Sequence, residues 1–236
     1  MEVDIYLSHE RGSTETPWLI SKNSFSFANY YHPKRNNFGT LRVLNEDLVF
    51  PNSGFSLHPH DNMEIVTIVL EGELEHRDTL NNHGRLKKGD VQRMSAGSGI
   101  RHSEMNPSKT EKVHFLQLWV LPAEQDLSPS YEQKSFTDQQ LTNRLCPIVA
   151  PKKSAETLYI HQDASFFLGK WNKETDFYHA PSDPKHGIFV FLIHGKAKVG
   201  GFNIKAGDSV AVTDATELPL TTYPGTELLL IELSMQ

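Results

Sequence analysis

The feature that most constrains the fold is a pair of polar motifs that flank a run of strand-like segments. The first motif is His58-Pro59-His60 and the second is His102-Ser103-Glu104. In a β-strand, residues i and i+2 point to the same face, so each motif directs two of its side chains to one side. An antiparallel sheet that pairs these strands would bring three imidazoles and a carboxylate to one point.

This set of side chains favours a divalent transition metal. Magnesium and calcium prefer oxygen ligands and would not use three histidines. The single cysteine, Cys146, lies far away in the sequence, so a thiolate-type structural zinc site is not expected. An isolated His-x-His pair is more often a surface or core feature than a metal site. The second motif, which follows a Gly-x-Gly turn, is what favours the metal.

Short segments with strand character recur along the chain, and turn sequences separate them. Such a rhythm predicts an antiparallel sandwich or barrel. The expected strands are residues 40–44, 65–70, 72–77, 91–94 and 114–120, with a further short strand at 24–31. Residues 121–135 are expected to form a crossing linker, and residues 138–145 one or two helical turns.

An internal repeat relates the two halves of the chain. Residues 70–75 resemble residues 193–198, and residues 86–91 resemble residues 204–209; each pair of segments combines a strand with a Gly or Gly-Asp turn. A duplicated β-domain is the simplest explanation.

The repeat also predicts that the metal site occurs once. Matching the turns of the two copies places Pro181, Asp183, Leu220 and Thr222 opposite the four polar residues of the first copy. The C-terminal histidines are out of phase with the motif and are expected at the surface or rim: His179, His186 and His194. We therefore expect one metal per chain, bound in the N-terminal half.

The sequences of these motifs resemble those of the pirin family of the cupin superfamily. The resemblance is carried by HPHDNMEIVT, LEGELEHRDT, MSAGSGIRHSEMNPS and the upstream NSFSFANYY. It implies an all-β bicupin, with two jelly-roll-like antiparallel β-barrels. Residues 1–130 would form the metal-binding N-terminal cupin domain, and residues 131–236 a C-terminal cupin-like domain without a metal site.

The resemblance implies a ligand set of His58, His60, His102 and Glu104. Two carboxylates compete for the fourth position, because Glu64 occupies the place of the glutamate in the ordinary cupin motif. The pirin pattern favours Glu104, and Glu64 would then lie outside the ligand set or line the cavity. Iron(II) is the first choice of metal, and the residues do not separate it from nickel, copper, manganese, cobalt or zinc.

The resemblance also implies a reaction. Several bacterial pirin-like proteins are quercetin 2,3-dioxygenases, which open the ring of a flavonol with O2 and release carbon monoxide. Glu104 would act as the base that removes the flavonol hydroxyl proton. Phe25, Phe27 and Phe55 are candidate pocket walls, although core packing is the simpler role for each. The alternative is a metal-dependent regulator that binds a protein partner such as a transcription factor.

Composition excludes some other classes of function. The 236-residue chain carries a net charge of −6, so direct nucleic-acid binding is not expected. No apolar run approaches the ~18 residues that span a bilayer, and the N-terminus lacks the pattern of a secretory signal. A cytoplasmic monomer is expected.

Overall fold

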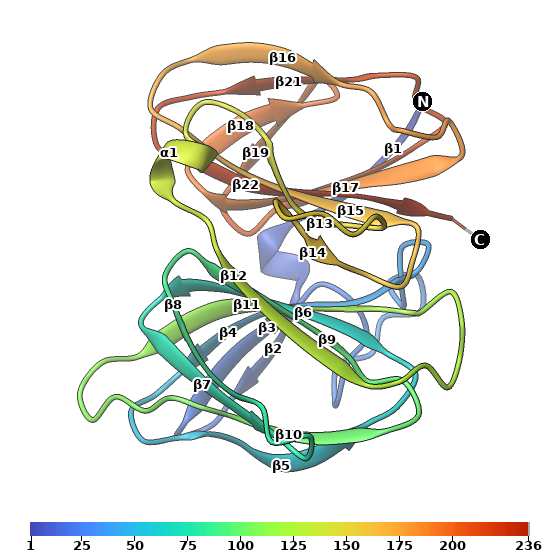
Figure 1. The fold of residues 1–236 in the computed structure, drawn as a ribbon. Helices are drawn as coiled ribbons and strands as arrows, with labels where there is room; N and C mark the ends of the chain where they lie inside the picture. Colours follow the sequence, from blue (N-terminus) through green and yellow to red (C-terminus); the bar gives the residue numbers. More distant parts are fainter. Residues whose placement is uncertain (236) are drawn as a thin grey trace.

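The computed structural model describes residues 1–235 and shows two stacked β-barrels (Figure 1). The lower barrel in that view comes mainly from the N-terminal half, and the upper one from the C-terminal half. Within the described residues, helix is confined to a 3-10 turn, η1 (Ser8–Glu10), and one short helix, α1 (Asp138–Leu141). Among residues 1–235, no helix is long and apolar enough to cross a membrane.

The N-terminal barrel consists of a seven-stranded sheet facing a four-stranded sheet. The larger sheet contains β2 (Gly12–Glu15), β3 (Leu19–Asn23), β4 (Leu41–Val49), β6 (Glu64–Glu71), β9 (Asp90–Ser95), β11 (Val113–Val120) and β12 (Ser130–Ser135). The smaller sheet contains β5 (Gly54–His60), β7 (Glu73–Asp78), β8 (His83–Lys87) and β10 (Ile100–Met105).

The C-terminal barrel repeats this arrangement of seven and four strands. Its larger sheet contains β1 (Glu2–Tyr6), β13 (Cys146–Ala150), β14 (Leu158–Tyr159), β15 (Ala164–Trp171), β17 (His186–His194), β20 (Ser209–Thr213) and β22 (Thr226–Ser234). Its smaller sheet contains β16 (Thr175–His179), β18 (Lys196–Val199), β19 (Phe202–Lys205) and β21 (Leu218–Thr222).

The two large sheets pack against each other at the centre of the molecule. Alternate residues of β6, such as Val66 and Ile68, point into this junction, where they join Phe189 and Phe191 of β17 in one buried apolar cluster. The intervening residues of β6, such as Thr67, point into the N-terminal barrel. Each strand of the central sheets therefore separates a domain interior from the interdomain core.

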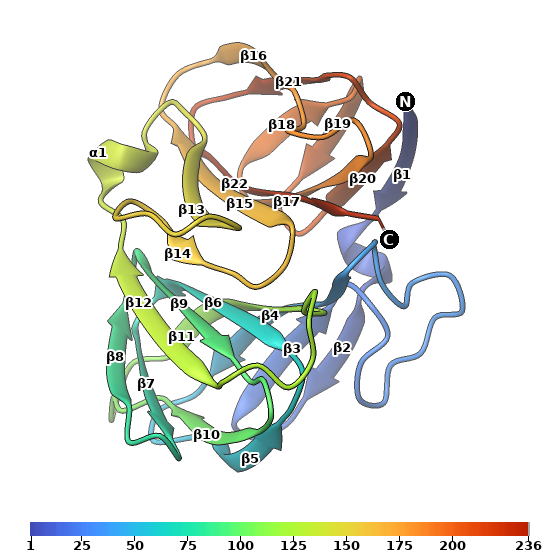
Figure 2. The same ribbon diagram turned by 45° about the vertical axis from the view of Figure 1, so that its right-hand side comes forward.

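The two halves of the chain are connected near residue 130, and strand pairing links them further. β1 pairs antiparallel with β20 in the C-terminal sheet, and β12 pairs antiparallel with β9 in the N-terminal sheet. Figure 2 shows β1 along the edge of the upper barrel, close to β20. Each strand covers an edge that would otherwise expose unpaired backbone groups.

Most expected strands are present and are longer than the sequence predicted, but two expectations were wrong. Residues 24–31 form no strand, because Ser26 turns the chain: its Oγ accepts from the backbone N–H of His32, and its own N–H donates to the carbonyl of Arg35. The expected linker at 121–135 ends in strand β12. The helix after it is a single turn, closed by a capping box between Thr137 and Gln140.

Candidate metal centre

The two polar motifs lie on paired strands of the small N-terminal sheet. β5 carries His58 and His60, and β10 carries His102, which lies directly opposite His58. The ring centroids are 4.4 Å apart for His58 and His102, 4.8 Å for His58 and His60, and 4.9 Å for His60 and His102. One nitrogen from each ring lies within 4.8 Å of the others, so the three rings converge.

The hydrogen bonds of two of these rings direct a lone pair towards the cluster. His58 Nδ1 lies 2.7 Å from the carbonyl oxygen of Ser56, which can only accept, so this nitrogen carries the proton. The Nε2 atom of His58 is then left with the lone pair. His102 Nδ1 lies 3.4 Å from Nδ1 of His76, whose Nε2 lies 3.1 Å from the Asp78 carboxylate.

The Asp78 carboxylate determines which nitrogen of His76 and of His102 carries the proton. Burial raises the pKa of Asp78, but hydrogen bonds from Asn82 and His76 outweigh it and leave the pKa below its ordinary value. The ionised carboxylate accepts from His76 Nε2–H, so His76 Nδ1 is the acceptor for His102 Nδ1–H. The lone pair of His102 is thereby placed on Nε2.

The unpaired nitrogens provide a test of whether a metal fits. His60 Nε2 and His102 Nε2 are buried and have no hydrogen-bond partner. Burial, together with the neighbouring histidines, lowers the pKa of His60 to about 4 and that of His102 to about 3. Both rings are therefore neutral near pH 7, the form that binds metals. A borderline transition metal fits this set of donors.

Glu104 lies buried beside the histidines, but its carboxylate is held by amide and hydroxyl donors. Oε1 accepts from Gln92 Nε2 at 3.1 Å and from Thr67 Oγ1 at 3.3 Å, and Oε2 accepts from Gln117 Nε2 at 2.5 Å. The ligand atoms of Glu104, His76 and His102 lie within 4.8 Å of one another, whereas Glu104 is not this close to all three histidines of the first cluster. A carboxylate has about four acceptor positions, so these bonds leave capacity for a further partner.

Glu64 lies elsewhere, on the face of β6 that points towards the other domain. Its Oε2 accepts from Ser95 Oγ at 3.0 Å and from the backbone N–H of His161 at 3.2 Å. His161 belongs to the C-terminal half, so Glu64 ties the two domains together. This placement separates the two competing carboxylates: Glu104 accompanies the histidines and Glu64 does not.

His76 and Asp78 were missed by the sequence analysis, although a signal was present. They form a second His-x-acid pair, after His102 and Glu104, and lie on β7, the strand that pairs with β10 on the side opposite β5. The His76 ring also stacks on Tyr131, with 4.5 Å between ring centroids. Tyr131 comes from β12, which the sequence analysis had placed in a linker.

The C-terminal histidines take other positions. His194 is exposed, as expected. His186 was expected at the surface or rim, and this was wrong: it is only 6% exposed, with Nδ1 2.9 Å from Glu232 and Nε2 3.0 Å from Asp163. The carboxylate of Glu232 also lies 3.1 Å from His179 Nε2.

A cavity of about 170 Å³ lies one residue away from the candidate centre, and none of the four predicted ligands lines it. Phe27 and Phe55 line this cavity, and so does Gln117, which donates to Glu104 and so connects the cavity to the centre. Phe27 packs edge-on against Trp119, which in turn packs edge-on against His60. Phe25, in contrast, is buried in the interdomain core.

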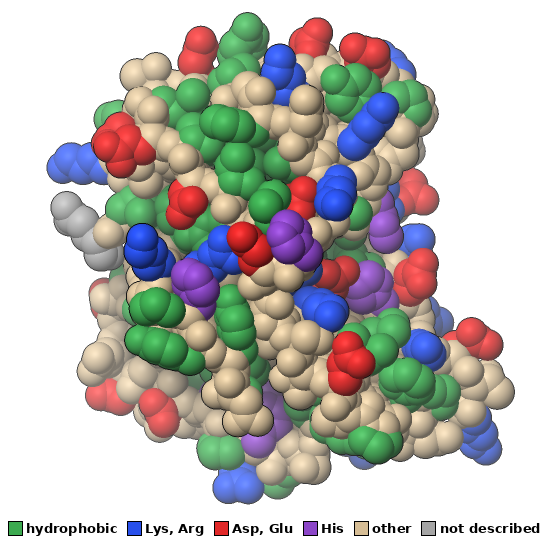
Figure 3. Space-filling model, turned by 180° about the vertical axis from the view of Figure 1, so that it is seen from behind, with side chains coloured by type: hydrophobic (Ala, Val, Ile, Leu, Met, Phe, Trp, Pro, Cys, Tyr) green, Lys and Arg blue, Asp and Glu red, His purple; other side chains and the backbone are tan. Residues whose placement is uncertain are grey.

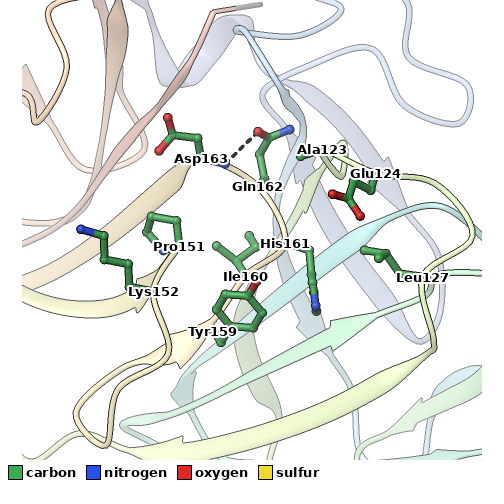
Figure 4. Close-up of a pocket in the computed structure, with 10 residues that line it drawn as sticks. All are labelled: Ala123, Glu124, Leu127, Pro151, Lys152, Tyr159, Ile160, His161, Gln162 and Asp163. Carbon is green, nitrogen blue, oxygen red and sulfur yellow. Dashed lines mark hydrogen bonds between the residues drawn. The ribbon is translucent and has the colours of Figure 1, made fainter.

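A second hollow lies between the domains, away from the three histidines. Its volume is about 360 Å³, and Figure 4 shows its lining of Tyr159, Ile160 and His161 facing Leu127. Figure 3 shows charged and histidine side chains across the middle of the rear face. Lys152, Glu124 and Asp163 give this hollow a rim of mixed charge, which selects no single class of ligand.

Comparisons with known proteins agree with this architecture. The family model described as Pirin matches residues 6–120, and a model described as the quercetinase C-terminal cupin domain matches residues 147–233. A quercetin 2,3-dioxygenase of Escherichia coli strain K12 is 37% identical over 231 residues, which cover 97% of this chain and 98% of the relative.

Solved structures show the same fold. The crystal structure of the bacterial pirin YhhW from Escherichia coli, in complex with nickel(II), matches with a TM-score of 0.93 and 34% identity and covers 99% of both chains. A structure of GK1651 from Geobacillus kaustophilus, at 23% identity, matches with a TM-score of 0.76 over 99% of this chain and 94% of its own. The expected all-β fold with two cupin domains is confirmed.

Proposed function

The chain belongs to the pirin family, and from this membership we propose that it is a metal-dependent dioxygenase that cleaves flavonols such as quercetin. The observation that carries the proposal is the cluster of three converging imidazoles, two of which, His60 and His102, each have a buried nitrogen without a hydrogen-bond partner. A relative named quercetin 2,3-dioxygenase spans nearly the whole chain. A bacterial pirin of the same fold has been solved with nickel.

We propose that His58, His60, His102 and Glu104 hold one metal per chain, with iron(II) as the metal that supports turnover. When bound there, the metal would supply Lewis-acid and redox chemistry for the reaction of the flavonol with O2. Glu104 would remove the hydroxyl proton of the flavonol. Gln92 and Gln117 hold its two carboxylate oxygens, so the base is oriented before the substrate arrives.

The cavity would hold one ring of the flavonol. Its volume of about 170 Å³ compares with the ~150 Å³ engineered cavity that binds benzene. The walls contributed by Phe27 and Phe55 suit a flat aromatic ring. Ring cleavage would consume one O2 and release carbon monoxide.

The test is turnover by iron-loaded protein. Purified protein is loaded with iron(II) and mixed with quercetin in air, and the loss of flavonol absorbance is followed together with O2 uptake and carbon monoxide release. His102→Ala should abolish all three signals, and His194→Ala, which removes an exposed histidine of the C-terminal half, should leave them unchanged. Fully loaded protein that consumes neither O2 nor flavonol would refute the dioxygenase proposal and favour a role in binding a protein partner.

A further inference from the structure

The cavity beside the candidate centre has a polar end that the proposed chemistry does not use. On β3 and β4, Asn23 lies opposite Asn45 and Ser21 lies opposite Asp47, and all four side chains line the cavity. Asn45 in turn lies opposite Gln117 of β11. A row of amide side chains therefore leads from Glu104, through Gln117 and Asn45, to the far end of the cavity.

Two acceptors at this end are buried without a partner. Asn23 Oδ1 and Asp47 Oδ1 have no hydrogen-bond donor, although Asn23 is 1% exposed and Asp47 is 2% exposed. The orientation of Asn23 is set by its amide nitrogen, which donates to Asn45 Oδ1 at 2.9 Å and to Ser21 Oγ at 3.2 Å. Its oxygen therefore faces away from both. Buried acceptors are normally paired, and these two line the same cavity.

We propose that the pendant ring of the flavonol enters this cavity. There Asn23 and Asp47 accept hydrogen bonds from hydroxyl groups of that ring, and so select flavonols whose pendant ring is hydroxylated. The inference rests on the proposed function, because it assigns the part of the substrate that enters this cavity. The ligand must bring a donor, since Asn23 Oδ1 can only accept and Asp47 Oδ1 accepts in its ionised form, and it must be flat and apolar elsewhere, since Phe27 and Phe55 line the same cavity. A phenol satisfies both requirements.

The spacing of the two acceptors suits a ring that carries more than one hydroxyl group. Asn23 and Asp47 are diagonal neighbours on the same face of an antiparallel strand pair, a relation that separates backbone positions by about 7–8 Å. Both side chains line one small cavity, so a single ring can approach both. Burial raises the pKa of Asp47 to about 7, and a hydrogen bond from Ser21 offsets only part of this rise. A phenolic hydroxyl would supply a donor to Oδ1, the oxygen that has none.

The experiment measures binding separately from turnover. Iron(II)-loaded protein is titrated without O2 with quercetin, whose pendant ring carries two hydroxyls, and with galangin, whose pendant ring carries none. Wild type should bind quercetin about 10- to 100-fold more tightly, the usual cost of leaving one or two buried acceptors unpaired. Asn23→Leu and Asp47→Leu should remove most of this preference by weakening quercetin binding while galangin binding is kept.

A matched control and a milder pair of variants complete the design. Asn203→Leu makes the same change at an exposed position of β19 and should keep the wild-type preference. If a leucine variant does not fold by circular dichroism, Asn23→Ser and Asp47→Asn are used instead, and a partial loss in the same direction is expected.

Equal affinity of wild type for the two flavonols, or an unchanged preference in the folded variants, would overturn the inference. Failure of the proposed function gives a different result. If both flavonols are turned over without preference, the dioxygenase proposal stands and the proposed selectivity is refuted. If quercetin is bound selectively but no O2 is consumed, the selectivity stands and the dioxygenase proposal is refuted.

Discussion

The two barrels have the same arrangement of strands, but their interiors differ. In the C-terminal barrel the interior is one continuous apolar cluster, which includes Val190, Leu218 and Leu220. In the N-terminal barrel the interior is split into two smaller apolar clusters. The buried polar side chains of the N-terminal barrel interior include Thr67, His76, Gln92, His102, Glu104 and Gln117.

This difference shows that the same arrangement of strands occurs with an apolar interior and with a polar one. The C-terminal barrel uses its inward positions for packing, and its buried Thr222 donates to the backbone carbonyl of Thr175. The N-terminal barrel uses the equivalent strands to present groups that are costly to bury unless they are paired. Unpaired atoms such as His60 Nε2 are then best explained by a ligand.

The largest effect is expected when a histidine is removed from the N-terminal barrel. His102→Ala should lose both metal and flavonol turnover, because His102 contacts both other imidazoles of the cluster. Metal content per chain, measured by elemental analysis after loading and dialysis, should fall from about one to near zero.

The reverse substitution tests the C-terminal barrel. Leu220→His places an imidazole among apolar side chains without a partner, so it should lower the melting temperature and bind no additional metal. A metal content near two per chain in wild type would contradict the contrast between the barrels.

The next effect concerns the carboxylate. Glu104→Gln keeps the shape but removes the charge and the basicity, so turnover should fall by about 10²–10⁴-fold with a modest loss of metal affinity. Glu64→Gln should do less, since Glu64 binds Ser95 and the backbone of His161 at the domain junction. Rates are compared at equal metal occupancy. If Glu64→Gln abolished turnover and Glu104→Gln did not, the roles would be exchanged.

A smaller effect is expected from pH acting on the C-terminal domain. Burial raises the pKa of Glu232, but hydrogen bonds from His179, Ser182 and His186 outweigh it and lower the pKa to about 2. Its stabilising contribution is therefore full above pH 4.5, the ordinary value, and is lost as the pH falls towards 2. A shift of this size corresponds to on the order of 3 kcal/mol.

His186 limits the same network at higher pH. Burial lowers the pKa of His186, but its bonds to Glu232 and Asp163 raise it above the ordinary value of 6.5. Its contribution is present below pH 6.5 and is lost as the pH rises through the raised value. Urea unfolding of wild type and Glu232→Gln should differ most between about pH 4.5 and 6.5. A difference independent of pH from 3 to 8 would contradict this assignment.

The sequence predicted the fold and the convergence of the three histidines because both depend on local periodicity. His58, His60 and His102 follow from strand alternation, and β6 and β11 follow from their apolar runs. The exchange of β1 and β12 between sheets depends on which edges remain open in three dimensions, and no local pattern encodes that. Residues 24–31 alternate like a strand but form a loop, because Ser26 bonds to the backbone.

The candidate site shows the same limit. Glu104 and Glu64 could not be separated by spacing alone, because which carboxylate accompanies the histidines depends on the face of β6 that turns towards the second domain. The polar end of the cavity was not visible either, since Asn23 and Asp47 are ordinary polar residues until the sheet places them in one cavity.

The smallest effect tests the residues that the sequence analysis missed. Asp78 holds His76, and His76 holds His102, so that the lone pair of His102 lies on Nε2. Asp78→Asn keeps the size but lets the side chain donate to His76 Nε2, which reverses the protons along the chain. Metal affinity should fall by about 10- to 100-fold, the usual cost of losing the group that orients a ligand. A competition titration with a chelator measures this directly.

Asp176→Asn changes a carboxylate bound to Thr221 on the outer sheet of the C-terminal barrel and serves as the matched control. If Asp78→Asn bound metal as tightly as wild type, His102 would keep its orientation without the hydrogen bonds from Asp78 through His76. The contrast between the barrels would then rest on the three histidines and Glu104 alone.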